Sequence, residues 1–238
     1  MTKFDAEAIV VGGGAVGLAI GYALAQRGRE VLVLESGPRI GEGVSSRNSG
    51  VIHAGLYYPT HSLRARLCVA GRRELYPFLE AHGVDHRRCG KLIVATQDEE
   101  RATLQRLLQQ GQANGVEGLR LIEADEARAM EPALRCIAAL HSAETGVLDV
   151  HGYMLALRGE IENRGGLVVC ETRMVAARSR APAAGWEVQT AHGSEHTTLR
   201  AQYLITAAGL EAQSVAAAIE GYPASHIPRR HLGKGVYF

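Results

Sequence analysis

The chain has 238 residues, of which 46% are hydrophobic and 21% are charged, and its formal net charge is +1 at pH 7. This composition is typical of a folded globular protein and excludes a disordered chain. The basic residues are dispersed, so we expect no nucleic-acid partner. The four cysteines lie far apart and form no paired motif. This favours reduced thiols in the cytoplasm over a disulfide framework.

The N-terminal segment has the pattern of a dinucleotide-binding unit. An apolar strand, a glycine turn, a helix and a second apolar strand follow one another, namely residues 8–11, Gly12-x-Gly14-x-x-Gly17, a helix starting at Ala15 and Val16, and residues 31–34 before Glu35. Gly12 permits the tight turn, Gly14 lets the backbone approach the phosphates, and Gly17 lets the helix pack closely. Glu35 is placed to accept a hydrogen bond from the ribose, and its charge disfavours NADP. The segment therefore predicts an adenine dinucleotide site.

The same segment mimics a secretory signal peptide, because Lys3 precedes an apolar run. We reject this interpretation, because Asp5 and Glu7 lie where positive charge is required and three consecutive glycines interrupt the run. No stretch approaches the roughly 18 apolar residues of a bilayer-spanning helix. We therefore expect no transmembrane segment.

The rest of the chain predicts a mixture of helices and strands. Residues 36–58, rich in Gly, Ser and Asn, predict a long loop with a binding role. Helices are predicted at 62–82, 98–113, 123–130, 150–163 and from Gly209 to Ile219, and strands at 91–96, 138–141, 167–170, 174–179, 186–190, 197–200, 203–206 and 233–238.

The helix at 62–82 is predicted to be amphipathic. Its inward face is expected to comprise Leu63, Leu67, Ala70, Leu75, Phe78 and Leu79, with Arg64, Arg66, Arg72 and Arg73 mostly outside that face. Pro77 lies within this helix and is expected to kink or break it.

Three further motifs identify a family resemblance. They are SSRNSGVIHAG at 45–55 with Tyr57-Tyr58, GKLIVAT at 90–96 and LITAAGL at 204–210. Together with the N-terminal fingerprint they resemble the FAD-dependent oxidoreductases of the D-amino-acid oxidase superfamily, and within it the L-2-hydroxyglutarate oxidase/dehydrogenase branch. The motif at 45–55 is the specific one, whereas the fingerprint and the motif at 204–210 are shared across the superfamily. The resemblance covers all 238 residues.

The resemblance implies an α/β fold, α+β overall, with a Rossmann-like FAD-binding domain and an interleaved, incomplete substrate domain. It assigns residues 1–85 and 146–225 to the first and residues 86–145 and 226–238 to the second. Chains of the family continue past the equivalent of Phe238. We therefore expect a fragment, a shortened recombinant chain or a disrupted gene.

The resemblance also implies a set of FAD contacts. Hydroxyl and amide donors among small neighbours suit phosphate or flavin oxygens. Val175 is expected to contact adenine through its backbone, with a plain core strand as the alternative. The expected contacts are Gly12, Gly14, Ala15, Val16, Gly17, Glu35, Ser36, Ser45, Ser46, Arg47, Asn48, Ser49, Val175, Ala208 and Gly209.

Candidate catalytic and substrate residues follow from the chemistry of hydroxy-acid oxidation. His53 is the expected base for the hydroxyl proton, and its alternatives are a backbone hydrogen bond or a flavin contact. Arg47 is expected to neutralise a phosphate or hold a substrate carboxylate, with a solvated loop arginine as the alternative. Tyr57, Tyr58 and Lys234 are expected to line the substrate pocket, with packing or exposure as the alternative.

The implied activity is oxidation of a small 2-hydroxy acid, foremost L-2-hydroxyglutarate, by hydride transfer to FAD. The alternatives are an inactive FAD-binding fragment, a glycerol-3-phosphate or amino-acid oxidase, and an NAD-binding dehydrogenase module. The electron acceptor is open between oxygen and a membrane quinone, and the expected location is cytoplasmic or peripheral at the inner membrane face. No metal is expected: His82, His86 and Cys89 have a zinc-like spacing without an evident fourth ligand.

Overall fold

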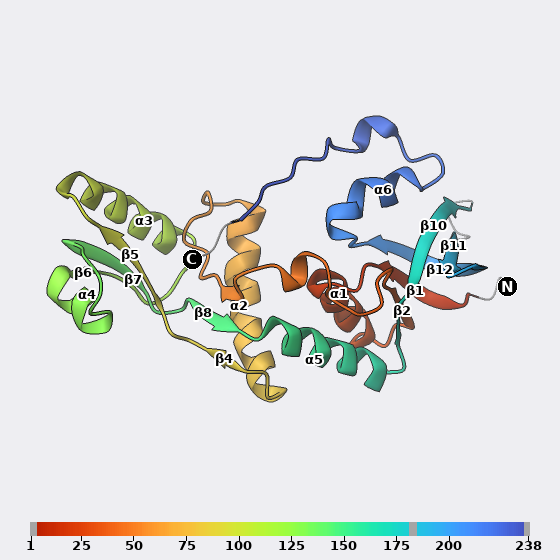
Figure 1. Ribbon diagram of the computed structural model, residues 1–238, viewed down its shortest axis with the longest axis horizontal. Helices are drawn as coiled ribbons and strands as arrows, with labels where there is room; N and C mark the ends of the chain where they lie inside the picture. Colours follow the sequence, from red (N-terminus) through yellow and green to blue (C-terminus); the bar gives the residue numbers. More distant parts are fainter. Residues whose placement is uncertain (1–3, 181–184, 236–238) are drawn as a thin grey trace. The chain divides into compact units, whose positions relative to one another are not determined.

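The computed structural model describes residues 4–180 and 185–235 and divides into two compact units (Figure 1). Unit 1 comprises Met1–Asn48 and Val150–Phe238, and unit 2 is the continuous segment Ser49–Asp149. Each unit contains α-helices and its own β-sheet structure, which confirms the mixed α/β fold class.

Unit 1 is built on one sheet of six strands in the order β10-β11-β12-β1-β2-β9. Strands β12, β1, β2 and β9 are parallel, and β10, β11 and β12 form an antiparallel meander. The strands are β1 (Ala6–Val11), β2 (Val31–Leu34), β9 (Leu167–Val169), β10 (Thr172–Ser179), β11 (Trp186–His192) and β12 (Glu195–Thr206). The helices and 3₁₀ turns are α1 (Ala15–Ala25), η1 (Val44–Ser46), α5 (Val150–Asn163), η3 (Gly209–Glu211), α6 (Ala212–Ala217) and η4 (Ala224–His226).

Strand β12 is one long strand, so the prediction of two strands at 197–200 and 203–206 was wrong. Its first half pairs with β11 in the antiparallel direction, and its second half pairs with β1 in the parallel direction. Ala201 belongs to both ladders, opposite Trp186 and opposite Ala6. The strand therefore joins the meander to the parallel sheet without interruption.

Helices α1 and α5 pack against each other beside β2 (Figure 1). A Cβ atom added to Gly21 of α1 would lie 2.9 Å from Cδ1 of Ile161 on α5 and 3.0 Å from Cγ2 of Val33 on β2. The missing side chain therefore lets the three elements approach. A further core, which includes Ile9, Met174 and Val188, lies on the sheet and buries apolar surface from the parallel strands and the meander.

Unit 2 contains two three-stranded antiparallel sheets, β3-β8-β4 and β5-β7-β6. The strands are β3 (Val51–Ile52), β4 (His86–Arg87), β5 (Lys91–Ala95), β6 (Leu119–Glu123), β7 (Ala138–Ser142) and β8 (Gly146–Leu148). The helices are α2 (Leu63–Ala81), η2 (Asp98–Glu100), α3 (Arg101–Ala113) and α4 (Ala124–Met130). Strands β3, β4, β6 and β8 were not predicted, because strands as short as β3, β4 and β8 leave no alternation in the sequence and exist only through their pairing.

Helix α2 has the predicted bounds, and Pro77 does not break it. Ser62 caps it, since its Oγ accepts a hydrogen bond from the Ala65 amide at 3.1 Å. The predicted inward face was correct only in part: Leu79 is buried, but Leu63 and Leu67 are 65% and 63% exposed. The buried residues of the helix are Ala65, Val69, Arg72, Tyr76 and Leu79.

Arg72 can occupy this inward face because Glu117 and Glu144 pair with its guanidinium group. Its side chain is only 4% exposed. Arg72 was predicted to lie mostly outside the inward face, but its charge belongs to the interior of unit 2.

The predicted domains and the compact units divide the chain differently. The units separate after Asn48 and after Asp149, whereas the predicted domains separate after residues 85, 145 and 225. Compact units reflect packing and the predicted domains reflect binding roles, so the functional division stays a prediction. Gly233–Gly235 form no strand, and the rest of the strand predicted at 233–238 lies outside the described residues.

Candidate functional site

The glycine turn of unit 1 has a shape that only glycine permits at two positions. Gly12 has a φ of +115°, and its amide donates to the Leu34 carbonyl at 2.8 Å. A Cβ atom at Gly12 would overlap the Ala207 carbonyl oxygen, and one at Gly17 would overlap the Gly12 carbonyl oxygen. The turn therefore lies directly against residues 207–209, where Ala208 and Gly209 were predicted to contact the cofactor.

We call the glycine turn, the N-terminus of α1 with Ser45, and Glu35 the dinucleotide cradle. The N-terminus of α1 is its second part. Gly14 is its N-cap and brings no side chain, while the Ala15 amide donates to Ser45 Oγ at 3.0 Å. The first amides of a helix have no acceptor within it and bind anions such as a pyrophosphate. Val16, the next residue, is 68% exposed. Ser45 is 30 residues away from Ala15 in the sequence, and the structure brings the two together; a phosphate contact of Ser45 stays a prediction.

Glu35 lies at the end of β2 and holds the backbone on both sides. Its Oε2 accepts from the Gly13 amide at 2.8 Å, and its Oε1 accepts from the Gly37 amide at 2.7 Å. Ser36 Oγ also lies 3.4 Å from Oε1. A carboxylate oxygen has capacity for more than one hydrogen bond, so this arrangement is compatible with a ribose hydroxyl.

The loop around η1 carries the remaining polar candidates of unit 1. Asn48 Nδ2 donates to the Ser45 carbonyl at 2.7 Å, and Arg47 donates to Ser46 Oγ at 3.1 Å. Arg47 is exposed and has no carboxylate partner within residues 4–180 and 185–235. Its charge is therefore available to an anion. Ser49, the last predicted contact in this run, begins unit 2.

Val175 lies at a bulge in β10. Met174 faces Thr190 and Ala176 faces Gln189, so the register shifts at Val175 and its backbone falls outside the ladder with β11. Its residue surface is 38% exposed. The backbone contact of Val175 with an adenine ring stays a prediction, with a plain core strand as its alternative.

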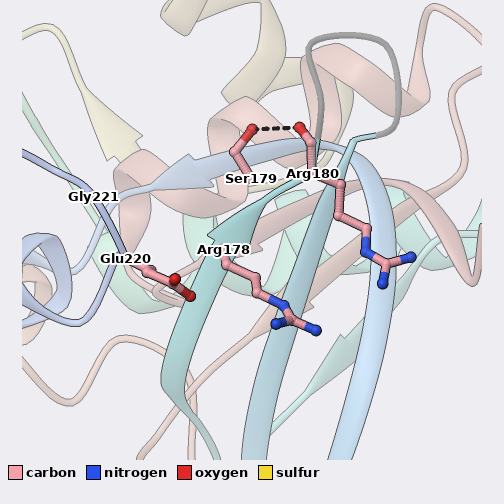
Figure 2. A pocket seen from close by; sticks show the side chains of 5 residues that line it. All are labelled: Arg178, Ser179, Arg180, Glu220 and Gly221. Carbon is pink, nitrogen blue, oxygen red and sulfur yellow. Dashed lines mark hydrogen bonds between the residues drawn. The ribbon is translucent and has the colours of Figure 1, made fainter.

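A shallow hollow of about 500 Å³ lies at the end of β10 (Figure 2). It is lined by Arg178, Ser179, Arg180, Glu220 and Gly221. Both arginines form ion pairs with Glu187 on β11, which also pairs with Arg200, so one carboxylate is shared among three guanidinium groups. None of the predicted site residues lines this hollow, and we assign it no role.

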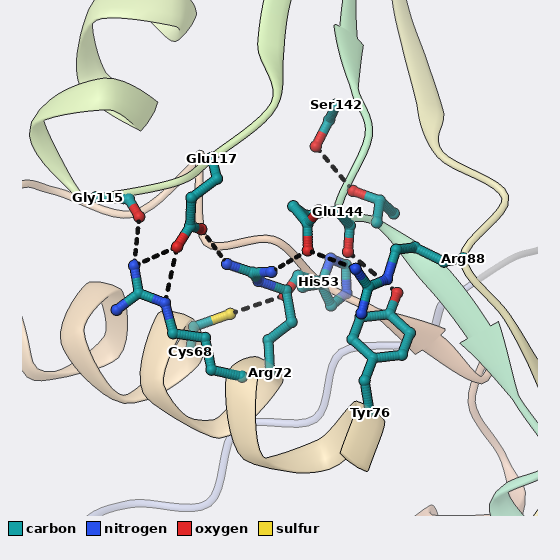
Figure 3. A network of polar contacts seen from close by, with 11 residues as sticks. His53, Cys68, Arg72, Tyr76, Arg88, Gly115, Glu117, Ser142 and Glu144 are labelled. Atoms are coloured by element: carbon teal, nitrogen blue, oxygen red, sulfur yellow. Dashed lines mark hydrogen bonds and ion pairs between the residues drawn. The ribbon is translucent and has the colours of Figure 1, made fainter. Parts of the chain in front are cut away.

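In unit 2, His53 follows β3 and is held through its backbone. Its carbonyl oxygen accepts a hydrogen bond from Cys68 Sγ of α2 at 3.3 Å (Figure 3). Its ring is exposed at one side, yet partial burial and the nearby Lys91 ammonium lower the pKa of His53 below its ordinary value. The imidazole is therefore neutral at neutral pH, as a base must be.

The segment Gly55–Tyr58 is pinned by two amides of α3. Gln110 Nε2 donates to the carbonyls of Leu56 and Tyr58 at 3.1 and 2.9 Å. Asn114 Nδ2 donates to the carbonyls of Gly55 and Tyr58 at 3.1 and 2.8 Å. These contacts fix the loop that carries both predicted pocket tyrosines. Neither amide has a local signal in the sequence, because their acceptors lie in a distant segment.

The predicted site residues thus fall into two groups. Unit 1 contains the glycine turn, Glu35, Ser45 and Arg47, while unit 2 contains His53 and the two tyrosines. Lys234 is exposed in a segment without regular structure. Lys91, whose ammonium group lies over the Tyr57 ring, was not among the predicted residues.

Neither a metal-binding group nor a membrane-spanning helix is found among the described residues. Among the residues that the structure describes, no group of three or more His, Cys, Asp or Glu side chains is arranged to hold a metal ion. Within the same residues, no helix combines the length and the apolar character needed to cross a bilayer.

Named relatives match most or all of the chain. L-2-hydroxyglutarate dehydrogenase of Arabidopsis thaliana mitochondria is 36% identical, covering 100% of this chain and 54% of the relative. The human mitochondrial enzyme of the same name is 35% identical over 86% of this chain and 46% of the relative, and that of Indibacter alkaliphilus is 35% identical over 89% and 52%. The chain spans about half the length of these relatives.

Solved structures of similar fold include oxidases. L-α-glycerophosphate oxidase of Mycoplasma pneumoniae, solved with FAD bound, aligns with a TM-score of 0.81 at 24% identity, covering 90% of this chain and 57% of that one. Glycine oxidase of Geobacillus kaustophilus aligns with a TM-score of 0.75 at 26% identity, covering 91% and 58%. The fold prediction is therefore confirmed.

The cradle of unit 1 fits FAD, because a turn without side chains, the free end of a helix and a carboxylate follow one another in the order that a dinucleotide requires. The family profile described as FAD dependent oxidoreductase matches residues 7–237. The chain therefore belongs to the FAD dependent oxidoreductase family, and its cofactor is FAD.

Proposed function

We propose that this chain contributes to the oxidation of a small 2-hydroxy acid, foremost L-2-hydroxyglutarate, to the 2-oxo acid. The observation that carries the proposal is the dinucleotide cradle built by the glycine turn, Ser45 and Glu35. The choice of substrate is supported by relatives named L-2-hydroxyglutarate dehydrogenase that are 34% to 37% identical to this chain.

In this proposal each residue of the chain has a defined task. The first amides of α1 and Arg47 neutralise the pyrophosphate, and Glu35 binds the ribose. His53, neutral because its pKa is lowered, accepts the proton of the substrate hydroxyl as the carbonyl double bond forms. FAD supplies the hydride acceptor for the hydrogen that leaves the substrate carbon.

The test is a visible absorption spectrum of the purified chain after incubation with FAD and removal of free cofactor. L-2-Hydroxyglutarate is then added without oxygen. We expect retained flavin bands that bleach, and we expect His53→Gln to retain the bands and bleach roughly 10² to 10⁴ times more slowly.

The other outcomes separate the alternatives. Retained bands that bleach only with glycerol 3-phosphate or an amino acid identify one of those oxidase activities. Retained bands that bleach with none of these substrates identify an inactive FAD-binding fragment, and a colourless chain contradicts the proposal. Reoxidation of the bleached flavin by oxygen or by a quinone identifies the acceptor. A cytoplasmic location, with contact at the inner membrane face as its alternative, remains a prediction.

A further inference from the structure

Lys91 is held rigidly at its backbone in unit 2. It is the first residue of β5 and pairs with Ser142 of β7. Gly90 before it has a φ of +73°, and its amide donates to the Thr145 carbonyl at 2.9 Å. The origin of the Lys91 side chain is therefore fixed by two separate contacts.

The Lys91 side chain reaches the loop that carries the predicted active-site residues. Its Nζ atom lies 4.5 Å from the centroid of the Tyr57 ring, within the range of a cation–π contact. Its charge also acts on the imidazole of His53. The ammonium group and an aromatic ring thus lie together in the compact unit that also contains the expected base.

The charge of Lys91 has no carboxylate partner in the part of the chain that the structure describes. Three arginines of unit 2 differ in this respect, since Arg72 and Arg88 (Figure 3) and also Arg73 each meet Glu117 or Glu144. An ammonium group has three N–H donors, and the face of Tyr57 accepts none of them as a conventional acceptor. A half-buried cation without an acid beside it is suited to an anionic ligand.

We propose that Lys91 binds a carboxylate of the substrate and thereby holds its hydroxyl carbon beside His53, with Tyr57 forming one wall of the site. This inference rests on the proposed function and deepens it, because it names the group that selects acids. A neutral alcohol has nothing to pair with Lys91, so acidic substrates are preferred.

The test uses the purified FAD-loaded chain and glutarate, a dicarboxylate without the reacting hydroxyl. Calorimetric titration measures its Kd in the wild type, Lys91→Met, Lys91→Arg and Arg106→Met. We expect Lys91→Met to weaken glutarate binding by roughly ten- to a hundredfold, because a hydrogen-bonded ion pair is lost. Lys91→Arg keeps the charge and should retain most of the affinity.

Arg106→Met is the matched control, because it removes one exposed positive charge from α3 of the same unit. It should leave the Kd unchanged. NMR titration of the histidines gives a second readout: Lys91→Met should raise the pKa of His53, and Arg106→Met should leave it unchanged. Circular dichroism establishes that each variant is folded.

The outcomes separate this inference from the proposed function. Equal glutarate affinity in the wild type and Lys91→Met overturns the inference, as does a site that prefers inorganic phosphate to glutarate. Lys91-dependent glutarate binding without bleaching by L-2-hydroxyglutarate supports the inference and removes the proposed function. Bleaching by L-2-hydroxyglutarate with an unchanged KM in Lys91→Met supports the proposed function and overturns the inference.

Discussion

We expect that single substitutions in the glycine turn abolish FAD binding by unit 1. Gly17 and Gly159 both lie inside helices of this unit, yet only Gly17 faces a backbone atom that an added methyl group would overlap. Around Gly159 there is no atom within 4 Å of an added Cβ. The two positions are therefore a matched pair for testing the turn.

We expect Gly17→Ala to lower the free energy of unfolding of unit 1 by ~1–3 kcal/mol or more, because the Gly12 carbonyl must move. We also expect it to abolish FAD retention. Gly159→Ala should instead stabilise the protein by up to ~1 kcal/mol through helix propensity. Urea unfolding and the absorbance of retained flavin measure both effects. Normal flavin retention by Gly17→Ala would contradict the role given to the turn.

The lowered pKa of His53 predicts a pH dependence. A protonated imidazole cannot accept the hydroxyl proton, so flavin bleaching should slow as the pH falls through the pKa of His53. Burial and Lys91 lower that pKa, and the acidic limb should therefore lie below the ordinary histidine value of 6.5. Anaerobic stopped-flow measurements from pH 5 to pH 8 check this.

His53→Gln should remove the limb, whereas His231→Gln, an exposed histidine of unit 1, should retain it. A limb that survives His53→Gln would assign the base to another group.

Roles such as that of Gly17 are readable from sequence because the constraint is local. The role of Lys91 is not, because it arises from contacts with a loop about 35 residues earlier in the chain.

At the scale of elements, α2 depends on a buried charge. Arg72 pairs with Glu117 and Glu144, and its Nε lacks a hydrogen-bond partner within the described residues. Tyr76, one turn further on, donates to the Glu144 carbonyl at 3.1 Å (Figure 3). The helix is thus joined to the loops that contain both glutamates.

Arg72→Met should lower the free energy of unfolding by roughly 3–5 kcal/mol, because it leaves Glu144 without its buried partner. Arg73→Met removes an ion pair to the same Glu117, but the Arg73 side chain is 55% exposed and the loss should be about 0–1 kcal/mol. Chemical denaturation of both variants makes the comparison. Equal losses would show that burial of Arg72 contributes nothing.

Helices and strands were predictable from the sequence where the repeat of apolar and polar residues extends over several turns. The bounds of α2 and α5 were predicted closely because each spans several turns of alternating apolar and polar residues. The inward face of α2 was not, because partners outside the helix decide which of its charges can be buried. Strand β12 was divided in two for the same reason, since its continuity depends on two different neighbours.

The whole chain consists of two units with separate cores. The core of unit 1 includes Ile9 and Val188, and the cores of unit 2 include Leu56, Leu104 and Ala139. The sequence predicted two domains, but it could not locate the boundary at Asn48, because the motif at 45–55 reads as one continuous stretch while the packing divides it. Most of the predicted FAD contacts thus belong to unit 1, whereas His53 belongs to unit 2.

This division predicts that FAD stabilises one unit selectively. FAD at a hundred times its Kd adds about 2.7 kcal/mol to any state that binds it. Its cradle lies in unit 1, which also contains the one tryptophan of the chain, Trp186 of β11. The unfolding midpoint in urea followed by Trp186 fluorescence should therefore rise with FAD concentration.

Amide hydrogen exchange along α2 reports on unit 2, which is continuous in sequence and which we expect to open while unit 1 remains folded. Its exchange should be unchanged by FAD, and its transition in urea should not coincide with that of Trp186. Gly17→Ala provides the control, since it should remove the effect of FAD on the tryptophan signal. If FAD raised both signals equally, the two units would unfold as one cooperative body, and the cofactor would stabilise the His53 loop as strongly as its own cradle.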